Sequence, residues 1–308
     1  MSWLVIAAML PGLHWTGGLD TAKQLTAVGI ERIFVAPESR SAWEGLGFSA
    51  GSDAQLPSYT VVAAPSTRRE RSVGMATSTP WIEANGWHFL QGIDRAWYQE
   101  VPAGRAALAA AEAFSYGVDA VLDVKPEDIA SFGAMLQFLK ALPTGEGQTL
   151  ADIGFVNDGS PEAQEAMKLL ERRNLLFRAV EQPDPELDLN IQLGSAQFPR
   201  EAAANPHQFA AHVREELTDD KRLLRIFGSN VVLGHVTAVG GATRVHLLNY
   251  GPRGTVDRLR VRVEGAFAAA KLASFDADDT AVLDLTQRDG GTEFTVPRIV
   301  TYAVIDLN

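Results

Sequence analysis

The stretch AALAAAEAFSYGVDAVLDV (106–124) indicates the fold class most directly. Its first part belongs to a segment rich in Ala and Leu, for which we predict a helix over 104–116, with Gly117 as the residue that caps it. The apolar run 120–124 contains a single acid, Asp123, and has the composition of a strand covered on both faces. A helix, a glycine and a buried strand in this order predict an α/β fold.

The same order recurs earlier in the chain. Asp20 is placed to cap a helix that ends at Gly29, and an apolar strand over 30–37 follows it. A second apolar run at 58–65 predicts another buried strand, with a further short strand expected at 73–79. We therefore expect a partial or degenerate TIM-like (β/α) barrel domain over residues 1–145.

A second α/β unit is predicted after a linker. The segment PTGEGQ (143–148) is rich in turn residues. It precedes a strand at 151–156, a helix at 161–174 and a strand at 175–180. This order predicts a flavodoxin-like α/β domain over 149–228.

The pattern changes towards the C-terminus. A last helix is expected at 219–224. Two strands then flank Gly240-Gly241, which is a hairpin signal, and short apolar segments continue at close spacing without a helix. We predict a small antiparallel β-sandwich over 229–308.

Composition narrows the function classes. The net charge of −11 disfavours nucleic acid and anionic membranes as partners. The absence of cysteine excludes disulfides, thiolate zinc sites and cysteine nucleophiles. No apolar run reaches the ~18 residues of a membrane span, and no motif indicates a metal or a cofactor, so we expect none of these. Residues 1–12 fit either a remnant of an export signal or a first strand, which leaves export (periplasmic or extracellular) and a cytoplasmic location both open.

The stretch MATSTPWIEANGWHFLQGIDRAWY (75–98) is the candidate functional segment. It holds three of the six tryptophans, and aromatic side chains with a polar edge stack on sugar faces. Carboxylates near such aromatics could supply acid/base chemistry on a glycosidic bond. The alternative is that these aromatics belong to the core. The predicted substrate-binding residues are Trp15, Trp81, Asn85, Trp87 and His88, with His14 as a further sugar hydrogen-bonding residue.

Three carboxylates are the predicted catalytic residues. Glu83 lies between two tryptophans, where apolar neighbours suit a general acid. Asp123 lies in a buried strand, and Glu38 follows one, where α/β folds keep site residues. Each could instead cap a helix or remain solvated. Asp94 and Glu100 are fallback candidates, and Glu112, inside the predicted helix, is expected to be structural.

The order of the three predicted units resembles the modular build of β-galactosidase-type barrel glycoside hydrolases, in which an amidotransferase-like domain and a β-sandwich follow the barrel. The matching stretches are AALAAAEAFSYGVDAVL (106–122), GFVNDGSPE (154–162), VHLLNYG (245–251) and VPRIVTYAVIDL (296–307). The chain also resembles an uncharacterised bacterial glycoside-hydrolase-like family in HWTGGLDT (14–21), PWIEANGWHFL (80–90) and DDKRLLRIFGSNVV (219–232).

The resemblance implies a carbohydrate-active protein that hydrolyses a glycosidic bond by acid/base chemistry. A full barrel takes ~250 residues, more than the predicted first domain offers. The second hypothesis is therefore a non-catalytic carbohydrate-binding or assembly protein on a truncated barrel. The resemblance also implies a possible homo-oligomer through the second α/β unit.

Overall fold

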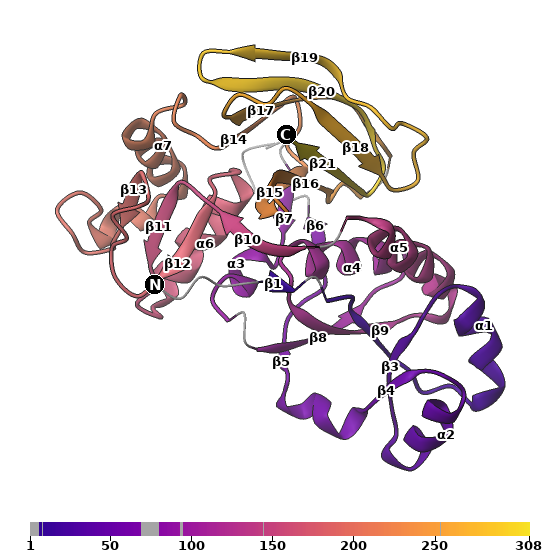
Figure 1. The fold of residues 1–308 in the computed structure, drawn as a ribbon. Coiled ribbons are helices and arrows are strands. Elements are labelled where there is room, and N and C mark those ends of the chain that lie inside the picture. Colours follow the sequence, from indigo (N-terminus) through magenta and orange to yellow (C-terminus); the bar gives the residue numbers. More distant parts are fainter. Residues whose placement is uncertain (1–5, 8, 69–79, 93–94, 144, 253) are drawn as a thin grey trace.

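The computed structural model describes residues 6–7, 9–68, 80–92, 95–143, 145–252 and 254–308. The described chain folds into a mixed α/β structure with several sheets. Figure 1 shows a parallel α/β unit from the first part of the chain at the lower right, a smaller α/β unit at the left, and antiparallel sheets at the top. No helix in the described part of the chain is long and apolar enough to cross a membrane.

The first unit is built on a six-stranded sheet with the order β4-β3-β2-β9-β8-β5. Every pair in it is parallel. Strands that follow one another in the chain pair with each other, except β4 and β5, which are not hydrogen-bonded to each other within the described residues. The last strand, β9, pairs with the first, β2. The strand order is therefore that of a ring opened at one place. The strands are β2 (Gly12–His14), β3 (Arg32–Val35), β4 (Ser49–Ser52), β5 (Thr60–Val61), β8 (Ala96–Val101) and β9 (Asp119–Val124).

Alternation along these strands gives the ring two different faces. Leu13, Ile33 and Leu122 point outward into the main core, against four helices. Those helices are α1 (Ala22–Ala27), α2 (Arg40–Gly45), α4 (Ala106–Ser115) and α5 (Ile129–Ala141). Phe34 and Val121 point inward and form a separate small cluster. The ring thus has an apolar outer layer and an inner face with its own packing.

Phe34 fills the inside of the ring because two neighbouring strands carry glycine opposite it. A Cβ atom on Gly51 would lie 2.6 Å from Phe34 Cε1, and one on Gly12 would lie 2.9 Å from Cε2. Nearer the amino ends of the strands, Arg32 pairs with Asp119 at 2.6 Å. Phe34 and the Arg32–Asp119 pair thereby occupy the inner face towards the amino ends of the strands.

The predicted helix and strand in 104–124 are confirmed as α4 and β9. The strand expected at 30–37 is β3, whereas 58–65 contains only the two-residue β5. Asp20 makes no side-chain cap, because a 3₁₀ turn at Leu19–Thr21 precedes α1. The strand predicted at 73–79 lies outside the described residues.

The second unit is a three-stranded parallel sheet with the order β12-β11-β13, which is the order of the first three strands in flavodoxin-like folds. The helix predicted at 219–224 is wrong, because the chain forms turns there and enters β14 at Leu224. The elements of this unit are β11 (Ile153–Val156), α6 (Pro161–Arg172), β12 (Phe177–Val180), β13 (Leu189–Ile191) and α7 (Pro206–Leu217). β14 (Leu224–Phe227) follows them in the chain and belongs to an antiparallel sheet of the next unit.

Two antiparallel sheets form the remaining unit, with orders β1-β10-β15-β16-β21-β18 and β14-β17-β20-β19. The hairpin predicted around Gly240-Gly241 joins β15 and β16. Apolar side chains from both sheets share one core. The strands not yet given are β1 (Ile6–Ala7), β10 (Glu146–Leu150), β15 (Val232–Val239), β16 (Ala242–Asn249), β17 (Val256–Glu264), β18 (Ala270–Ser274), β19 (Leu283–Arg288), β20 (Gly291–Ile299) and β21 (Tyr302–Leu307).

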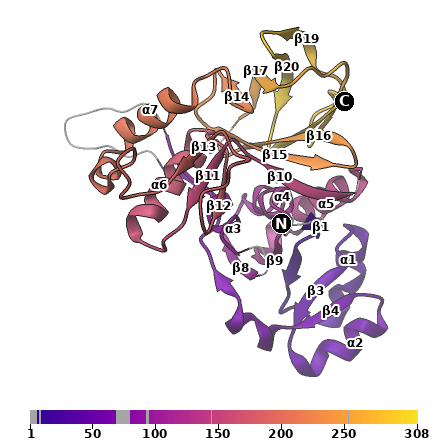
Figure 2. The same cartoon turned by 60° about the vertical axis from the view of Figure 1, so that its left-hand side comes forward.

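The linker predicted at 143–148 is corrected by this sheet. Residues 146–150 form β10, which pairs with β15, for example Gly147 with Val239. β1 adds to the other side of β10. The turn-rich composition concealed a strand whose partner lies far along the chain. Figure 2 shows β10 running beside β15 above the parallel unit. The predicted first domain therefore ends at residue 145, just before β10, and the predicted second domain begins at residue 149, inside β10.

Candidate functional site

Three polar side chains meet on the inner face of the ring, near the carboxyl ends of its strands. The Tyr98 hydroxyl donates to Asp123 Oδ2 at 3.2 Å and lies 3.4 Å from His14 Nδ1. The same His14 nitrogen is 3.5 Å from Asp123 Oδ2. His14 and Asp123 are register partners on β2 and β9, and Tyr98 comes from β8. Three adjacent strands thus bring one histidine, one phenol and one carboxylate together.

Glu100 joins this group from β8. It is the register partner of Asp123 and, two residues beyond Tyr98, points to the same inner face. The residues between them point outward, since Trp97 and Gln99 are 2% and 0% exposed. Neighbouring strands lie about 4.8 Å apart. The backbones of Glu100 and Asp123 are therefore about one strand spacing apart, with both side chains on the same face.

The group is open to solvent at the carboxyl ends of the strands. The Asp123 side chain is 38% exposed and that of His14 is 17% exposed, while Glu100 is exposed. Burial and the charge of Asp123 raise the pKa of Tyr98 to about 12. Tyr98 is therefore a protonated donor at neutral pH, and it orients one oxygen of Asp123. The ends of the parallel strands are where barrel enzymes hold their active sites.

Of the predicted site residues, Asp123, His14 and the fallback candidate Glu100 lie in this group, two others lie at the rim, and the fallback candidate Asp94 lies outside the described residues. Glu38 follows β3 in a short 3₁₀ turn, is exposed, and makes no hydrogen bond or ion pair within the described residues. It is separated from Asp123 by β2. Trp15 follows His14, and its indole N–H donates to Thr21 Oγ1 at 3.0 Å. Both are near the open end of the ring, outside the group formed by Tyr98, His14, Asp123 and Glu100.

Glu83 and Trp81 lie elsewhere, on the hairpin of β6 (Ser66–Arg68) and β7 (Trp81–Glu83). Glu83 accepts a hydrogen bond from Ser66 Oγ at 2.9 Å. The guanidinium of Arg172, from α6, lies 3.5 Å from the centroid of the Trp81 ring. This part of the predicted site faces the second unit, so the structure does not bring Glu83 together with Asp123.

The other predicted sugar-binding residues are corrected by their burial. Asn85 and Trp87 are 5% and 3% exposed, and neither presents a surface to a sugar. They begin the short helix α3 (Gly86–Phe89). His88 is half-buried, with its ring centroid 3.6 Å from that of Trp87, and burial lowers the pKa of His88 to about 4. The alternative interpretation, that these aromatics belong to the core, holds for Trp87.

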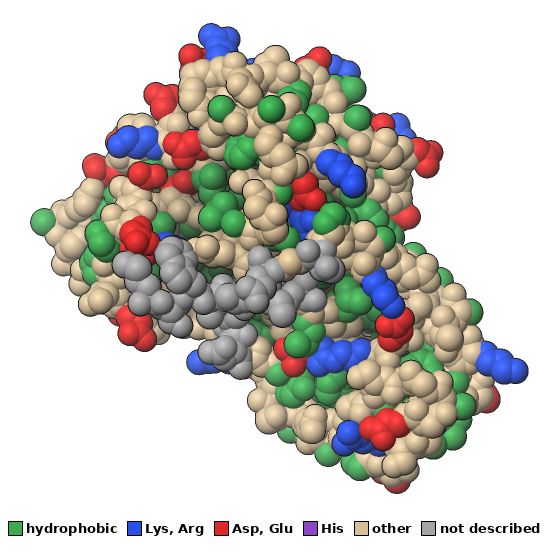
Figure 3. All heavy atoms as spheres, in the orientation of Figure 1, with side chains coloured by type: hydrophobic (Ala, Val, Ile, Leu, Met, Phe, Trp, Pro, Cys, Tyr) green, Lys and Arg blue, Asp and Glu red, His purple; other side chains and the backbone are tan. Residues whose placement is uncertain are grey.

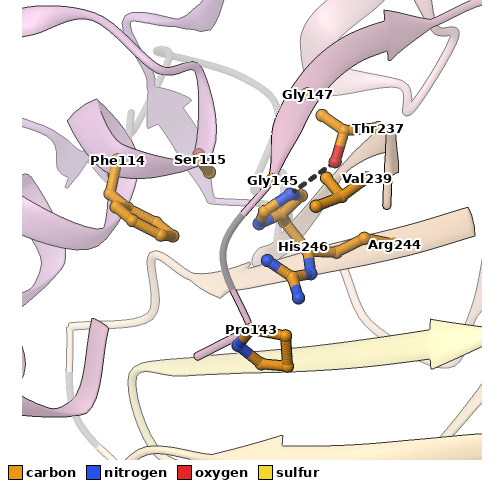
Figure 4. A pocket seen from close by; sticks show the side chains of 9 residues that line it. All are labelled: Phe114, Ser115, Pro143, Gly145, Gly147, Thr237, Val239, Arg244 and His246. Atoms are coloured by element: carbon orange, nitrogen blue, oxygen red, sulfur yellow. Dashed lines mark hydrogen bonds between the residues drawn. The ribbon is translucent and has the colours of Figure 1, made fainter. Parts of the chain in front are cut away.

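A small pocket lies between α4 and the antiparallel sheet (Figure 4). It has a volume of about 30 Å³, which is room for a water molecule rather than a substrate. The polar atoms of its histidine are used internally, because His246 bonds to Thr237 at 3.0 Å and to the Tyr302 hydroxyl at 2.6 Å. This pocket is therefore no candidate for a substrate site.

Charge and metal chemistry add no further candidate. Figure 3 shows acidic and basic side chains interspersed over the face it presents, without a large patch of one sign. Within the described ranges, no group of three or more His, Asp or Glu side chains is arranged to hold a metal ion.

The sequence could not reveal this grouping, although it held part of the signal. Alternation in AWYQEV (96–101) places Tyr98 and Glu100 on one face of a strand, but nothing in this segment alone distinguishes Tyr98 as a site residue. Which residues of β2 and β9 stand beside them depends on strand order and register, which single-sequence patterns do not contain.

Comparison with known proteins supports the fold. No protein-family model matches the chain, and no curated protein sequence matches it. The structure is similar to α-L-fucosidase isoenzyme 2 from Paenibacillus thiaminolyticus, with a TM-score of 0.58 and 10% identity over 93% of this chain and 71% of that enzyme. The fold is similar to that of glycoside hydrolases. A β-galactosidase from Bacillus circulans sp. alkalophilus also matches, with a TM-score of 0.39 and 10% identity, covering 96% of this chain and 63% of that enzyme.

Proposed function

We propose that this protein is a carbohydrate-active protein of the glycoside-hydrolase type, with its site on the inner face of the ring at the carboxyl ends of β2, β8 and β9. The observation that carries the proposal is the in-register pair Glu100 and Asp123, with Tyr98 bonded to Asp123. The glycoside-hydrolase-like fold supports it, but a fold alone does not determine activity.

The proposed reaction is hydrolysis of a glycosidic bond by these two carboxyl groups. Asp123, oriented by Tyr98, attacks the anomeric carbon while Glu100 protonates the leaving oxygen, so that the glycosidic bond breaks as the bond to Asp123 forms. Water then gives a proton to Glu100 and displaces Asp123 from the anomeric carbon, which releases the sugar. Adjacent strands favour the short carboxyl separation of a retaining mechanism. His14 bonds a sugar hydroxyl beside Asp123. Glu38 and Trp15, at the rim, extend the binding surface beyond the reacting sugar.

The test is hydrolysis of a panel of aryl glycosides by the purified protein and its variants. We expect Asp123→Asn and Glu100→Gln to lower kcat by at least about 10³-fold while the fold is retained. The matched control is Glu44→Gln, which removes an exposed carboxylate paired with Arg40 on the surface of α2. Full activity in both site variants would overturn the assignment of the pair.

A second candidate function is carbohydrate binding without hydrolysis. Within the described residues the ring has six strands, where a full barrel has eight. Specific glycan binding by the wild-type protein, with no turnover of any aryl glycoside, would favour this function over the first.

A further inference from the structure

Two carboxyl groups from different units converge on the start of α3, with Glu112 fully buried and Glu171 half-buried. Glu112, from α4, accepts hydrogen bonds from Asn85 N at 2.8 Å, Asn85 Nδ2 at 2.9 Å and the Tyr250 hydroxyl at 2.6 Å. Glu171, from α6, accepts from Gly86 N at 2.9 Å, Trp87 N at 3.2 Å and the Tyr116 hydroxyl at 3.3 Å. Three successive backbone N–H groups are therefore held by two side chains that are distant in sequence.

These contacts join three parts of the molecule. Glu112 belongs to α4, which packs on the parallel ring, Tyr116 caps the end of that helix, and Glu171 belongs to the second unit. Tyr250 follows β16 of the antiparallel sheet. The arrangement leaves no spare room, because a Cβ atom on Gly86 would lie 2.0 Å from the Tyr116 hydroxyl and 2.4 Å from Glu171 Oε1.

All six donors to the two carboxyl groups are neutral. Within the described part of the chain, neither carboxyl forms an ion pair with Lys, Arg or His. The nearby cations of α6 are turned to aromatic rings, with Lys168 over Trp87 and Arg172 over Trp81. On the other side, the ring of His235 packs on Tyr116 at 4.2 Å between centroids. The charge of Arg172 acts on Glu171 without an ion pair between them. Partial removal from water and the mutual repulsion of the two carboxylates disfavour ionisation of both.

A retained proton relieves this repulsion. Burial, and then the charge of Glu112, raise the pKa of Glu171 to about 8. Burial also raises the pKa of Glu112, against the hydrogen bonds from Tyr250 and Asn85. At neutral pH the pair therefore carries one negative charge or less. Above this range both groups must ionise in the interior or open to water.

We propose that Glu112 and Glu171 form a proton-dependent clamp on α3, which holds the ring, the second unit and the Tyr250 segment together and loosens when the second carboxyl ionises. Loosening frees Asn85, Gly86 and Trp87 from their acceptors. Since Trp87 packs in the core of the second unit, the junction of α3 with α6 opens first. This inference is independent of the proposed function.

The first test follows the carboxyl groups themselves. In wild-type protein labelled with ¹³C at the glutamate carboxyl carbon, we expect one glutamate signal to titrate with a midpoint near 8. Glu171→Gln should remove that signal. The control, Glu165→Gln, changes an exposed glutamate of the same helix and should leave it in place. If every glutamate has titrated below pH 6, the shared proton does not exist and the proposal is overturned.

The second test follows the clamp by hydrogen exchange at Gly86 and Trp87, with rates corrected for the intrinsic effect of pH. We expect protection of these amides to fall at least tenfold between pH 6.5 and 9 in the wild-type protein. Protection of β9 amides, which lie in the central sheet, should be unchanged. Constant protection of α3 across this range contradicts a clamp. Because both measurements use the wild-type protein, they hold even if Glu171→Gln does not fold.

Discussion

The Tyr98 hydroxyl donates to Asp123 Oδ2 across two adjacent parallel strands, 3.2 Å away. This bond places a phenol beside a carboxylate at the open end of the ring, within reach of His14. It predicts that Tyr98→Phe lowers kcat on an aryl glycoside by about 10²-fold, because Asp123 loses the group that orients it. KM should change little, and circular dichroism should confirm the fold. Unchanged kcat would show that Tyr98 does not position Asp123.

The inner face of the ring is tightly packed around the Phe34 side chain. Gly51→Ala places a Cβ atom 2.6 Å from the Phe34 ring, and we expect it to lower the free energy of unfolding by about 1–3 kcal/mol. Gly45→Ala is the control, since no atom lies within 4 Å of its added Cβ. In helix α2 that change should be neutral or stabilising by about 0.5–1 kcal/mol. Urea unfolding measures both. Equal effects would contradict a ring filled by Phe34.

The two tryptophans of the aromatic stretch should behave differently on truncation. Trp87 is 3% exposed and packs in the core of the second unit, so Trp87→Ala should cost about 3–5 kcal/mol. Trp81 is 39% exposed and stacks on Arg172, so Trp81→Ala should cost about 1 kcal/mol. Thermal or urea unfolding distinguishes them. A small effect of Trp87→Ala on the free energy of unfolding would show that Trp87 is not part of the core.

The stability of the protein should depend on pH through Asp152, which lies at the junction of the second unit with the antiparallel sheets. It is 4% exposed and accepts a hydrogen bond from Leu223 N at 2.9 Å. Burial raises its pKa from 3.8 to about 7. A raised carboxyl pKa stabilises the folded state below pH 3.8, and that contribution is lost progressively as pH rises to about 7. Asp152→Asn should flatten this part of the stability curve measured by thermal unfolding. An unchanged slope would contradict the prediction.

Local patterns in the sequence predicted helices and strands better than they predicted which strands pair with each other. The α4–Gly117–β9 order follows from Ala and Leu content and one glycine, and it is confirmed. The turn-rich segment 143–148 was expected to be a linker because its partner, β15, lies some 90 residues further along the chain. Its composition carries no trace of that pairing.

The candidate site shows the same division. Asp123, His14 and Glu100 could be selected as candidates from the sequence, whereas their grouping with Tyr98 depends on the ring order. The aromatic stretch suggested sugar stacking, yet Asn85 and Trp87 are held inside by Glu112 and Glu171. An acid in the middle of a predicted helix gave the signal for this buried contact, but not the identity of its partners.

The most direct test of the site is a glycan-array binding measurement on the wild-type protein, with Asp123→Ala and Trp81→Ala as the two variants. We predict specific binding to at least one glycan, lost in Asp123→Ala and retained in Trp81→Ala, because Asp123 is in the ring and Trp81 is on the hairpin against α6. Binding that survives Asp123→Ala and disappears in Trp81→Ala would contradict the account and move the site to the hairpin.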